Sequence, residues 1–274
     1  MYIKMNDEVN LYVKQSGKGL PCIFIHGGPG EGSLDFEILG GNVLEQYMQI
    51  TYFDQRGSAR SEGASTDDYS IERLTADIEE IREKLGIPKW IVMAHSFGGI
   101  IAANYVHKYQ NYVHKLILLN ATLSMEDSFI SQIVYGTILL NEKNSPEKCN
   151  YDLEKWQSIV SKLLEKDIFY KLQYEDYNNF VKLNEVSNGI ENFNANMSKQ
   201  AFNNKEYFKS YFELTKEITV PVLVITGNED YAIGPNHYKN FMFPNEEIKV
   251  IHGKHMLYLE NNEEFKAAVR EFIK

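Results

Sequence analysis

A serine placed on a tight turn between a strand-like and a helix-like segment is the feature that most restricts how this chain can fold. Residues 91–100 read IVMAHSFGGI: an apolar run leads into Ser96, two glycines follow, and a helix-like segment continues to Lys108. Small residues, Ala94 and Gly98, flank the serine, as they must where strand and helix backbones approach closely. This pattern predicts a nucleophile elbow, which holds the serine hydroxyl clear of the sheet. A glycine-rich turn without chemistry has a similar spelling, so the interpretation depends on partners elsewhere in the chain.

A reactive serine needs a base, and the base needs an acid that orients it. In chains built on this elbow, the order is Ser, then Asp or Glu, then His. Here an apolar run at 220–225 is followed by Asp230, and a second run at 248–251 is followed by His255. Both residues come just after a predicted strand, at the edge of a parallel sheet where ligands bind. The sequence therefore predicts a catalytic triad of Ser96, Asp230 and His255.

Two nearby residues are alternatives within this triad. Glu229 precedes Asp230 and is a second candidate for the acid, although the Gly-x-x-Asp spacing favours Asp230. His252 competes with His255, which we favour because it follows a glycine turn and does not end the strand.

A glycine-rich loop follows the first buried strand. Residues 26–30 read HGGPG, directly after the apolar segment 21–25. Such a loop can direct a backbone N–H at a developing negative charge, and the residue after the nucleophile supplies the second donor in this architecture. We therefore predict an oxyanion hole formed by the N–H groups of Gly28 and Phe97. A plain turn is the alternative interpretation, but the position between a buried strand and the serine elbow favours the oxyanion hole.

A further motif, DQRGS at residues 54–58, follows another strand-like run. We expect Asp54 and Arg56 to hold loops together through charge-assisted hydrogen bonds and not to act as catalysts. The loop at 26–30, this motif, the elbow, Gly-x-x-Asp and Gly-x-His, in that order, resemble the α/β-hydrolase fold. More narrowly, they resemble the proline iminopeptidase (prolyl aminopeptidase) family.

The resemblance covers the two ends of the chain, residues 1–121 and 215–274. It implies the fold, the triad and an activity that releases N-terminal residues, often proline, from small peptides. The elbow departs from the family, since it reads AHSFG where these peptidases more often carry GGSWG. The middle of the chain aligns with no family motif. The resemblance therefore supports the fold and the triad more strongly than it supports the prolyl specificity.

Strand-like and helix-like segments alternate along the chain, which predicts an α/β fold with a mostly parallel central sheet flanked by helices. Residues 1–15 alternate in polarity around an Asn-Asp turn and predict a hairpin. Apolar spacing predicts an amphipathic helix from Ser70 to Leu85, which stops at Gly86. The predicted core strands span residues 21–25, 49–53, 89–94, 115–119, 220–225 and 247–251.

The middle of the chain has a different texture. Residues 122–214 contain one proline and two glycines and are rich in Tyr, Phe, Asn, Glu and Lys with helical spacing. We predict a helical cap here, inserted into a core of residues 1–121 and 215–274, that roofs the site and selects the substrate. In the resembled peptidases, acidic cap residues bind the free amino group of the substrate. Glu185 and Glu191 are candidates for that role, although a solvated helix face is the more common explanation for such residues.

Composition restricts the partners. The net charge is −10, from 38 acidic and 28 basic side chains without a basic stripe, which disfavours nucleic acid and is compatible with a cationic substrate. Cys22 and Cys149 lie far apart and predict free thiols, not a disulfide framework. No secretory leader or membrane-spanning run is evident, and no residues cluster as metal ligands. We therefore expect a cytoplasmic protein that uses no metal, cofactor or membrane.

Three functions are compatible with these observations. The first is an aminopeptidase of the proline iminopeptidase type, which acts on small peptides through an acyl-enzyme. The second is a carboxylesterase or another hydrolase of small acyl or carbon–carbon substrates with the same triad. The third is a non-catalytic, ligand-sensing protein, which the complete triad disfavours. The oligomeric state stays open.

Overall fold

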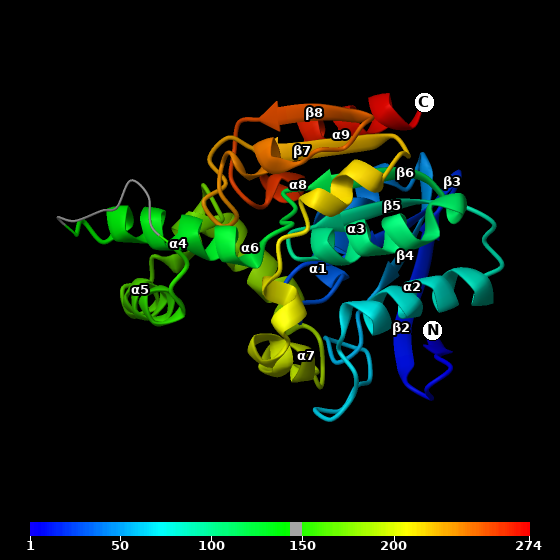
Figure 1. Cartoon of the computed structure of the whole chain (residues 1–274), viewed down its shortest axis with the longest axis horizontal. Helices are drawn as coiled ribbons and strands as arrows, with labels where there is room; N and C mark the ends of the chain where they lie inside the picture. Colours follow the sequence, from blue (N-terminus) through cyan, green and yellow to red (C-terminus); the bar gives the residue numbers. More distant parts are fainter. Residues whose placement is uncertain (143–149) are drawn as a thin grey trace.

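Within residues 1–142 and 150–274, which the computed structural model describes, eight strands form one sheet (Figure 1). In chain order the strands are β1 (Tyr2–Lys4), β2 (Asn10–Gly17), β3 (Leu20–Ile25), β4 (Met48–Phe53), β5 (Trp90–His95), β6 (Val113–Leu119), β7 (Val222–Gly227) and β8 (Glu246–Ile251). Their order across the sheet is β1-β2-β4-β3-β5-β6-β7-β8. The β1–β2 and β2–β4 pairs are antiparallel, and every pairing from β4 to β8 is parallel. The predicted α/β fold with a mostly parallel sheet is confirmed.

Helices cover both faces of this sheet. The helices in the described residues are α1 (Leu34–Leu39), α2 (Ile71–Lys84), α3 (Gly98–Tyr109), α4 (Met125–Leu139), α5 (Leu153–Glu165), α6 (Tyr177–Asn188), α7 (Asn196–Gln200), α8 (Leu257–Glu260) and α9 (Asn262–Ile273). Successive residues of β3 point to the two faces: Ile23 and Ile25 pack with α2 and α3, whereas Cys22 and Phe24 pack with α1 and α9. Burial on both sides explains why the central strands are continuous apolar runs.

The positions of the core strands and of the first long helix agree closely with those predicted from the sequence. Each of the six predicted core strands lies within two residues of an observed strand, and the hairpin expected in residues 1–15 is the β1–β2 pair. The helix expected from Ser70 to Leu85 is α2, whose first turn is capped because the Ser70 hydroxyl accepts the Arg73 N–H. It stops before Gly86, whose φ of 66° is the left-handed conformation common after helix ends.

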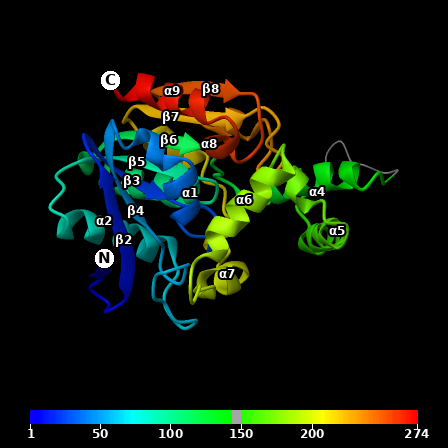
Figure 2. The same ribbon diagram turned by 180° about the vertical axis from the view of Figure 1, so that it is seen from behind.

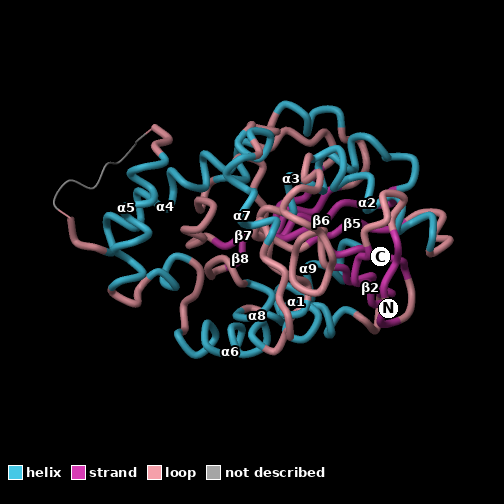
Figure 3. The backbone as a smooth tube through the Cα atoms, turned by 90° about the horizontal axis from the view of Figure 1, so that it is seen from below, coloured by secondary structure: helices cyan, strands magenta, loops and turns pink. Residues whose placement is uncertain are grey.

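Helices α4 to α7 occupy the chain between β6 and β7. α4 and α5 project from one side of the sheet (Figure 1 and Figure 2) and approach closely at Gly136, where a Cβ would lie 2.5 Å from Ile159 Cγ2. α6 lies beside α1, next to the core (Figure 3). The segment is helical, as the sequence predicts. Its division into a cap domain at 122–214 and a core at 1–121 and 215–274 stays a prediction.

Only one of the two cysteines lies in the described part of the chain. Cys22 is buried in β3 as a free thiol, and burial raises the pKa of that thiol. Cys149 lies outside the described residues. None of the described helices combines the length and apolar character that crossing a membrane requires.

Candidate active site

Ser96 lies on the turn between β5 and α3, at the end of the strand. Its φ is 54°, in the left-handed region that residues other than glycine seldom adopt. The turn is tight because a Cβ on Gly98 would lie 2.4 Å from the Ile25 carbonyl oxygen. His95 and Phe97 are buried on either side of Ser96, which keeps partial contact with solvent. The local geometry is that of the elbow expected from the sequence.

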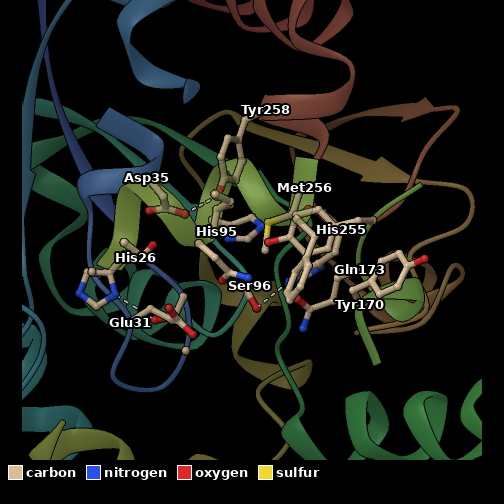
Figure 4. A pocket seen from close by; sticks show the side chains of 18 of the residues that line it. His26, Glu31, Asp35, His95, Ser96, Tyr170, Gln173, His255, Met256 and Tyr258 are labelled. Carbon is tan, nitrogen blue, oxygen red and sulfur yellow. Dashed lines mark hydrogen bonds between the residues drawn. The ribbon is translucent and has the colours of Figure 1, made fainter. Parts of the chain in front are cut away.

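The three residues of the predicted triad lie together at one edge of the sheet. His255 Nε2 lies 3.0 Å from Ser96 Oγ (Figure 4). On the other side of the ring, His255 Nδ1 lies 2.8 Å from Asp230 Oδ2. Asp230 is 0% exposed and His255 is 4% exposed. Burial opposes ionisation of Asp230, but the His255 ring and hydrogen bonds from His255 and Asn120 hold the pKa of that carboxyl below its usual value. With an Nδ1–H donating to Asp230, His255 Nε2 is free to accept the serine proton.

The two alternatives lie elsewhere. Glu229 is partly exposed, and it is Asp230, not its neighbour, that contacts the His255 ring. His252 is exposed, with Nδ1 3.3 Å from Asn228 Oδ1. The geometry therefore favours Asp230 and His255 over both alternatives.

Asn120 is a site residue that the sequence analysis missed. It is fully buried just after β6, and its Nδ2 donates to Asp230 Oδ2 at 2.5 Å and to the Lys254 carbonyl oxygen at 3.1 Å. The main-chain carbonyl oxygen of Asn120 accepts the Ser96 N–H at 3.1 Å. Asn120 therefore links Asp230 to the turn that carries Ser96. The only sequence signal is its position as the first polar residue after a buried strand.

The glycine loop after β3 lies against the serine. A Cβ on Gly27 would lie 2.8 Å from Ser96 Cβ and 3.4 Å from Ser96 Oγ. Gly28, with φ 119°, lines the same cavity as Ser96. Phe97 follows the serine directly at the start of α3. These positions place the backbone of both predicted oxyanion-hole residues next to Ser96, while their role as donors stays a prediction.

Buried polar contacts hold this loop in place. His26 Nε2 accepts the Gln55 N–H at 2.9 Å, and Gln55 Nε2 donates to the His26 carbonyl oxygen at 2.8 Å. Asp54 accepts hydrogen bonds from Ser33 and Arg60. These contacts join the turn after β4 to the loop after β3, which is the supporting role expected for Asp54.

Arg56, the other charged residue of the DQRGS motif, binds a different partner. Its Nε and Nη2 donate to the two Asp77 carboxylate oxygens at 2.6 and 2.7 Å, so it ties the turn to α2. Like Asp54, it is buried in a supporting contact and does not line the cavity around Ser96.

A cavity of about 300 Å³ opens above Ser96. Its apolar wall comes from both the core and the helical segment, and includes Phe24, Tyr170, Tyr174, Phe180, Leu183 and Met256. This volume is at the small end of ligand pockets. The cavity therefore suits a small substrate with an apolar part.

The structure does not bring Glu185 and Glu191 to this cavity. α6 turns Leu183, Asn184 and Ser187 toward the cavity. Glu185 lies on the opposite face of that helix because successive side chains rotate by about 100°, and it is exposed. Glu191 lies beyond the end of α6 and is also exposed.

Two other carboxylates, Glu31 and Asp35, do line the cavity (Figure 4). Glu31 is solvent-exposed, yet the surrounding protein and the Asp35 charge raise its pKa to about 7. Burial likewise raises the pKa of Asp35, although a hydrogen bond from Tyr258 partly offsets the shift. The sequence analysis missed both. Their position just after the HGGPG loop was the available signal.

In the described part of the chain, no group of three or more His, Cys, Asp and Glu side chains is arranged to hold a metal ion. The site itself contains a hydrogen-bonded Ser–His–Asp chain, a glycine loop and two cavity carboxylates.

Comparison with known families agrees with this architecture. A model of the α/β-hydrolase fold matches residues 21–262, and the chain belongs to that family. A proline iminopeptidase of Neisseria meningitidis is 32% identical over 167 residues, which are 60% of this chain and 50% of that enzyme. The match thus spans about half the length of that relative. A proline iminopeptidase of Pestalotiopsis fici is 25% identical over 270 residues, covering 92% of this chain and 90% of that enzyme.

Solved structures with the same fold include both peptidase-related proteins and esterases. The proline iminopeptidase-related protein of Thermus thermophilus superposes with a TM-score of 0.80 at 20% identity, covering 100% of this chain and 97% of that one. An esterase of Exiguobacterium antarcticum superposes with a TM-score of 0.73 at 18% identity, covering 99% and 98%. At these identities the likeness concerns the fold alone.

Proposed function

We propose that this chain is a serine hydrolase that acts through an acyl-enzyme, and that its substrates are small peptides from which it releases the N-terminal residue. The observation that carries the proposal is the hydrogen-bonded chain from Ser96 through His255 to Asp230, beside the glycine loop. The similarity to proline iminopeptidases supports the choice of substrate.

The proposed reaction follows from these positions. Ser96 Oγ attacks the carbonyl carbon while His255 Nε2 takes its proton and then gives it to the leaving amine. Asp230 holds the imidazole tautomer and stabilises the imidazolium that forms. The N–H groups of Gly28 and Phe97 stabilise the oxyanion. Water then attacks the acyl-enzyme with His255 as base, releasing the acid and restoring the serine.

We further propose that the segment 122–214 acts as a cap over the site. Tyr170, Phe180 and Leu183 of that segment line the cavity above Ser96, which supports a role in selecting the substrate. The apolar character of these side chains favours substrates with an apolar group.

A carboxylesterase is the second candidate. The AHSFG elbow differs from the spelling more frequent in the resembled peptidases. Since a Ser–His–Asp triad can hydrolyse esters as well as amides, the identity of the substrate depends on groups outside the triad.

The test compares arylamides of proline and alanine with short-chain nitrophenyl esters, using the wild type and Ser96→Ala. We expect serine-dependent cleavage of the arylamides, and a loss of kcat of about a millionfold in Ser96→Ala, the scale seen when a serine nucleophile is removed. Cleavage of esters alone would make the protein an esterase. Activity retained in a pure Ser96→Ala sample would contradict the nucleophile assignment.

A further inference from the structure

We propose that Glu31 and Asp35 bind the ammonium group of the substrate next to the acyl carbon that Ser96 attacks. The inference rests on the proposed function for the position of that carbon. It assigns amine recognition to the loop and helix after β3, in the core, and not to the helical segment between β6 and β7.

Both carboxylates lie in the cavity that contains the reacting hydroxyl. Glu31 belongs to the loop that follows HGGPG, and Asp35 belongs to the first turn of α1. Figure 4 shows them on the same side of Ser96, away from Tyr170 and Gln173. A substrate bound with its carbonyl carbon at Ser96 therefore has two acids beside one of its substituents.

The described residues supply no cation to balance these charges. No Lys or Arg lines the cavity, and neither Glu31 nor Asp35 forms an ion pair within residues 1–142 and 150–274. The nearby histidines do not compensate, because burial lowers the pKa of His26 and lowers that of His95 to about 3. Two like-charged carboxylates facing one cavity repel each other, so a cationic ligand bound between them relieves that repulsion.

Two buried carboxylates of the same chain, Asp54 and Asp77, have charged partners. Asp54 accepts from Ser33 and Arg60, and Asp77 receives the two-pronged contact from Arg56. Glu31, by contrast, accepts no side-chain hydrogen bond from any described residue. A stabilising role within the fold therefore explains the first two acids but not Glu31.

Asp35 is held in a fixed position. The Tyr258 hydroxyl donates to Asp35 Oδ2 at 2.5 Å, and Tyr258 itself is fully buried. Its ring lies edge-on to Phe36 at 5.2 Å and to His95 at 5.2 Å between centroids. A buried tyrosine that orients a carboxylate toward a cavity is an arrangement suited to a ligand and not to solvent.

Glu31 also contacts the proposed oxyanion-hole loop. A Cβ on Gly28 would lie 3.2 Å from Glu31 Cγ and 2.7 Å from the Glu31 backbone nitrogen. A negative charge on a side chain beside this loop disfavours the oxyanion that forms during acyl transfer. A substrate ammonium bound between Glu31 and the reacting carbon cancels that repulsion, so the site selects aminoacyl substrates over neutral acyl groups.

The first experiment measures kcat/KM of Glu31→Gln for alanine arylamide and for a neutral nitrophenyl ester. We expect a loss of about 10- to 100-fold on the arylamide, as for removal of a charged hydrogen-bond partner. On the ester we expect unchanged or higher activity, because the charge near the oxyanion hole is gone. Glu185→Gln, which alters an exposed acid on α6, is the matched control and should change neither rate. Equal losses on both substrates, or no loss on the arylamide, would overturn the inference.

The second experiment separates this inference from the proposed function. Calorimetry compares binding of alaninamide, a cation at pH 7, with binding of propionamide, its neutral analogue, independently of any turnover. We expect preferential binding of alaninamide by the wild type and by Glu185→Gln, a weaker preference in Asp35→Asn, and no preference in Glu31→Gln. Equal or undetectable binding of both compounds by the wild type would refute amine recognition. A protein that prefers alaninamide but cleaves only esters would retain the amine site and lose the peptidase assignment.

Discussion

The two walls of the cavity above Ser96 are built in different ways. On the core wall, side chains are fixed by directional contacts, such as those of His255 with Asp230 and of Asp35 with Tyr258. On the wall from the helical segment, Phe180 stacks at 5.6 Å on Tyr170, and the contacts are mainly aromatic and aliphatic. Directional contacts fix atoms to within tenths of an ångström, as proton transfer and charge recognition require, whereas apolar packing defines only a volume.

This difference teaches where selectivity resides. On our interpretation, the core wall determines both the reaction and the charge of the substrate, while the helical wall determines only the size of its apolar group. Changes on the core wall should therefore act on rate and on charge preference. Changes on the helical wall should act on KM.

The largest of the following effects is expected for Asn120, which contacts Asp230 on the core side of the cavity. In Asn120→Ala, Asp230 loses the donor that lies 2.5 Å from the oxygen facing His255. That bond lowers the pKa of Asp230, so its loss raises the pKa and leaves the acid less firmly ionised. We expect kcat to fall by about 100-fold, the scale of a hydrogen bond to a charged group, and to fall more at pH 5.5 than at pH 8. Steady-state kinetics between pH 5.5 and pH 8 measure both the fall in kcat and its dependence on pH.

Asn104→Ala is the matched control for that variant. Asn104 also donates its amide to a main-chain oxygen, that of Ile100 at 2.8 Å, but it lies on α3 away from the cavity. We expect its pH profile to match the wild type. If Asn120→Ala lowered activity by the same factor at every pH, Asn120 would be a structural residue and not a positioning one.

Much of the core wall follows from sequence because its motifs are local. The small residues around Ser96 and the glycines at 27 and 28 are required by backbone approach, which depends on a few neighbouring residues. Asp230 and His255 follow strands whose apolar runs are unmistakable, and parallel strands bring such ends to one edge. The predicted meeting of Ser96, Asp230 and His255 therefore needed no knowledge of side-chain packing.

The remaining residues depend on relations that a single sequence does not contain. Glu185 and Glu31 are both acids near polar stretches, and only the rotation of α6 and the path of the loop after β3 decide which one enters the cavity. Asn120 looks like an ordinary residue at a strand end until its distance to Asp230 is measured. The placement of α4 to α7 likewise rests on tertiary packing, for which helical spacing gives no direction.

An intermediate effect on substrate preference is expected when a change of pH alters the charge of Glu31 on the core wall. Glu31, whose pKa is raised to about 7, is ionised above that value and attracts an ammonium group, whereas below it the attraction fades. The ratio of kcat/KM for alanine arylamide to that for a neutral ester should therefore rise several-fold between pH 6 and pH 7.5. A pH effect on any step that the two substrates share acts on both rates equally and cancels in the ratio.

Two variants sharpen this pH test. Glu31→Gln removes the titrating group and should make the ratio independent of pH, while Asp35→Asn removes the neighbouring charge that raises the Glu31 pKa and should shift the rise to lower pH. A ratio that is already flat in the wild type would mean that Glu31 does not sense the substrate charge, and the core wall would lose its assigned role in charge selection.

The smallest effect is expected on the helical wall. Leu183 is 7% exposed and lines the cavity from α6, so Leu183→Ala enlarges the volume without removing a directional contact. We expect KM for arylamides with apolar side chains to rise a few-fold, kcat to stay near the wild-type value, and the free energy of unfolding to fall by about 2 to 3 kcal/mol. Leu164→Ala on α5, where the side chain is 55% exposed, is the matched control and should change neither KM nor stability appreciably. A fall in kcat with unchanged KM in Leu183→Ala would contradict the assignment of rate to the core wall and of substrate size to the helical wall. Such a result would mean that an apolar residue of the helical segment acts on the transition state.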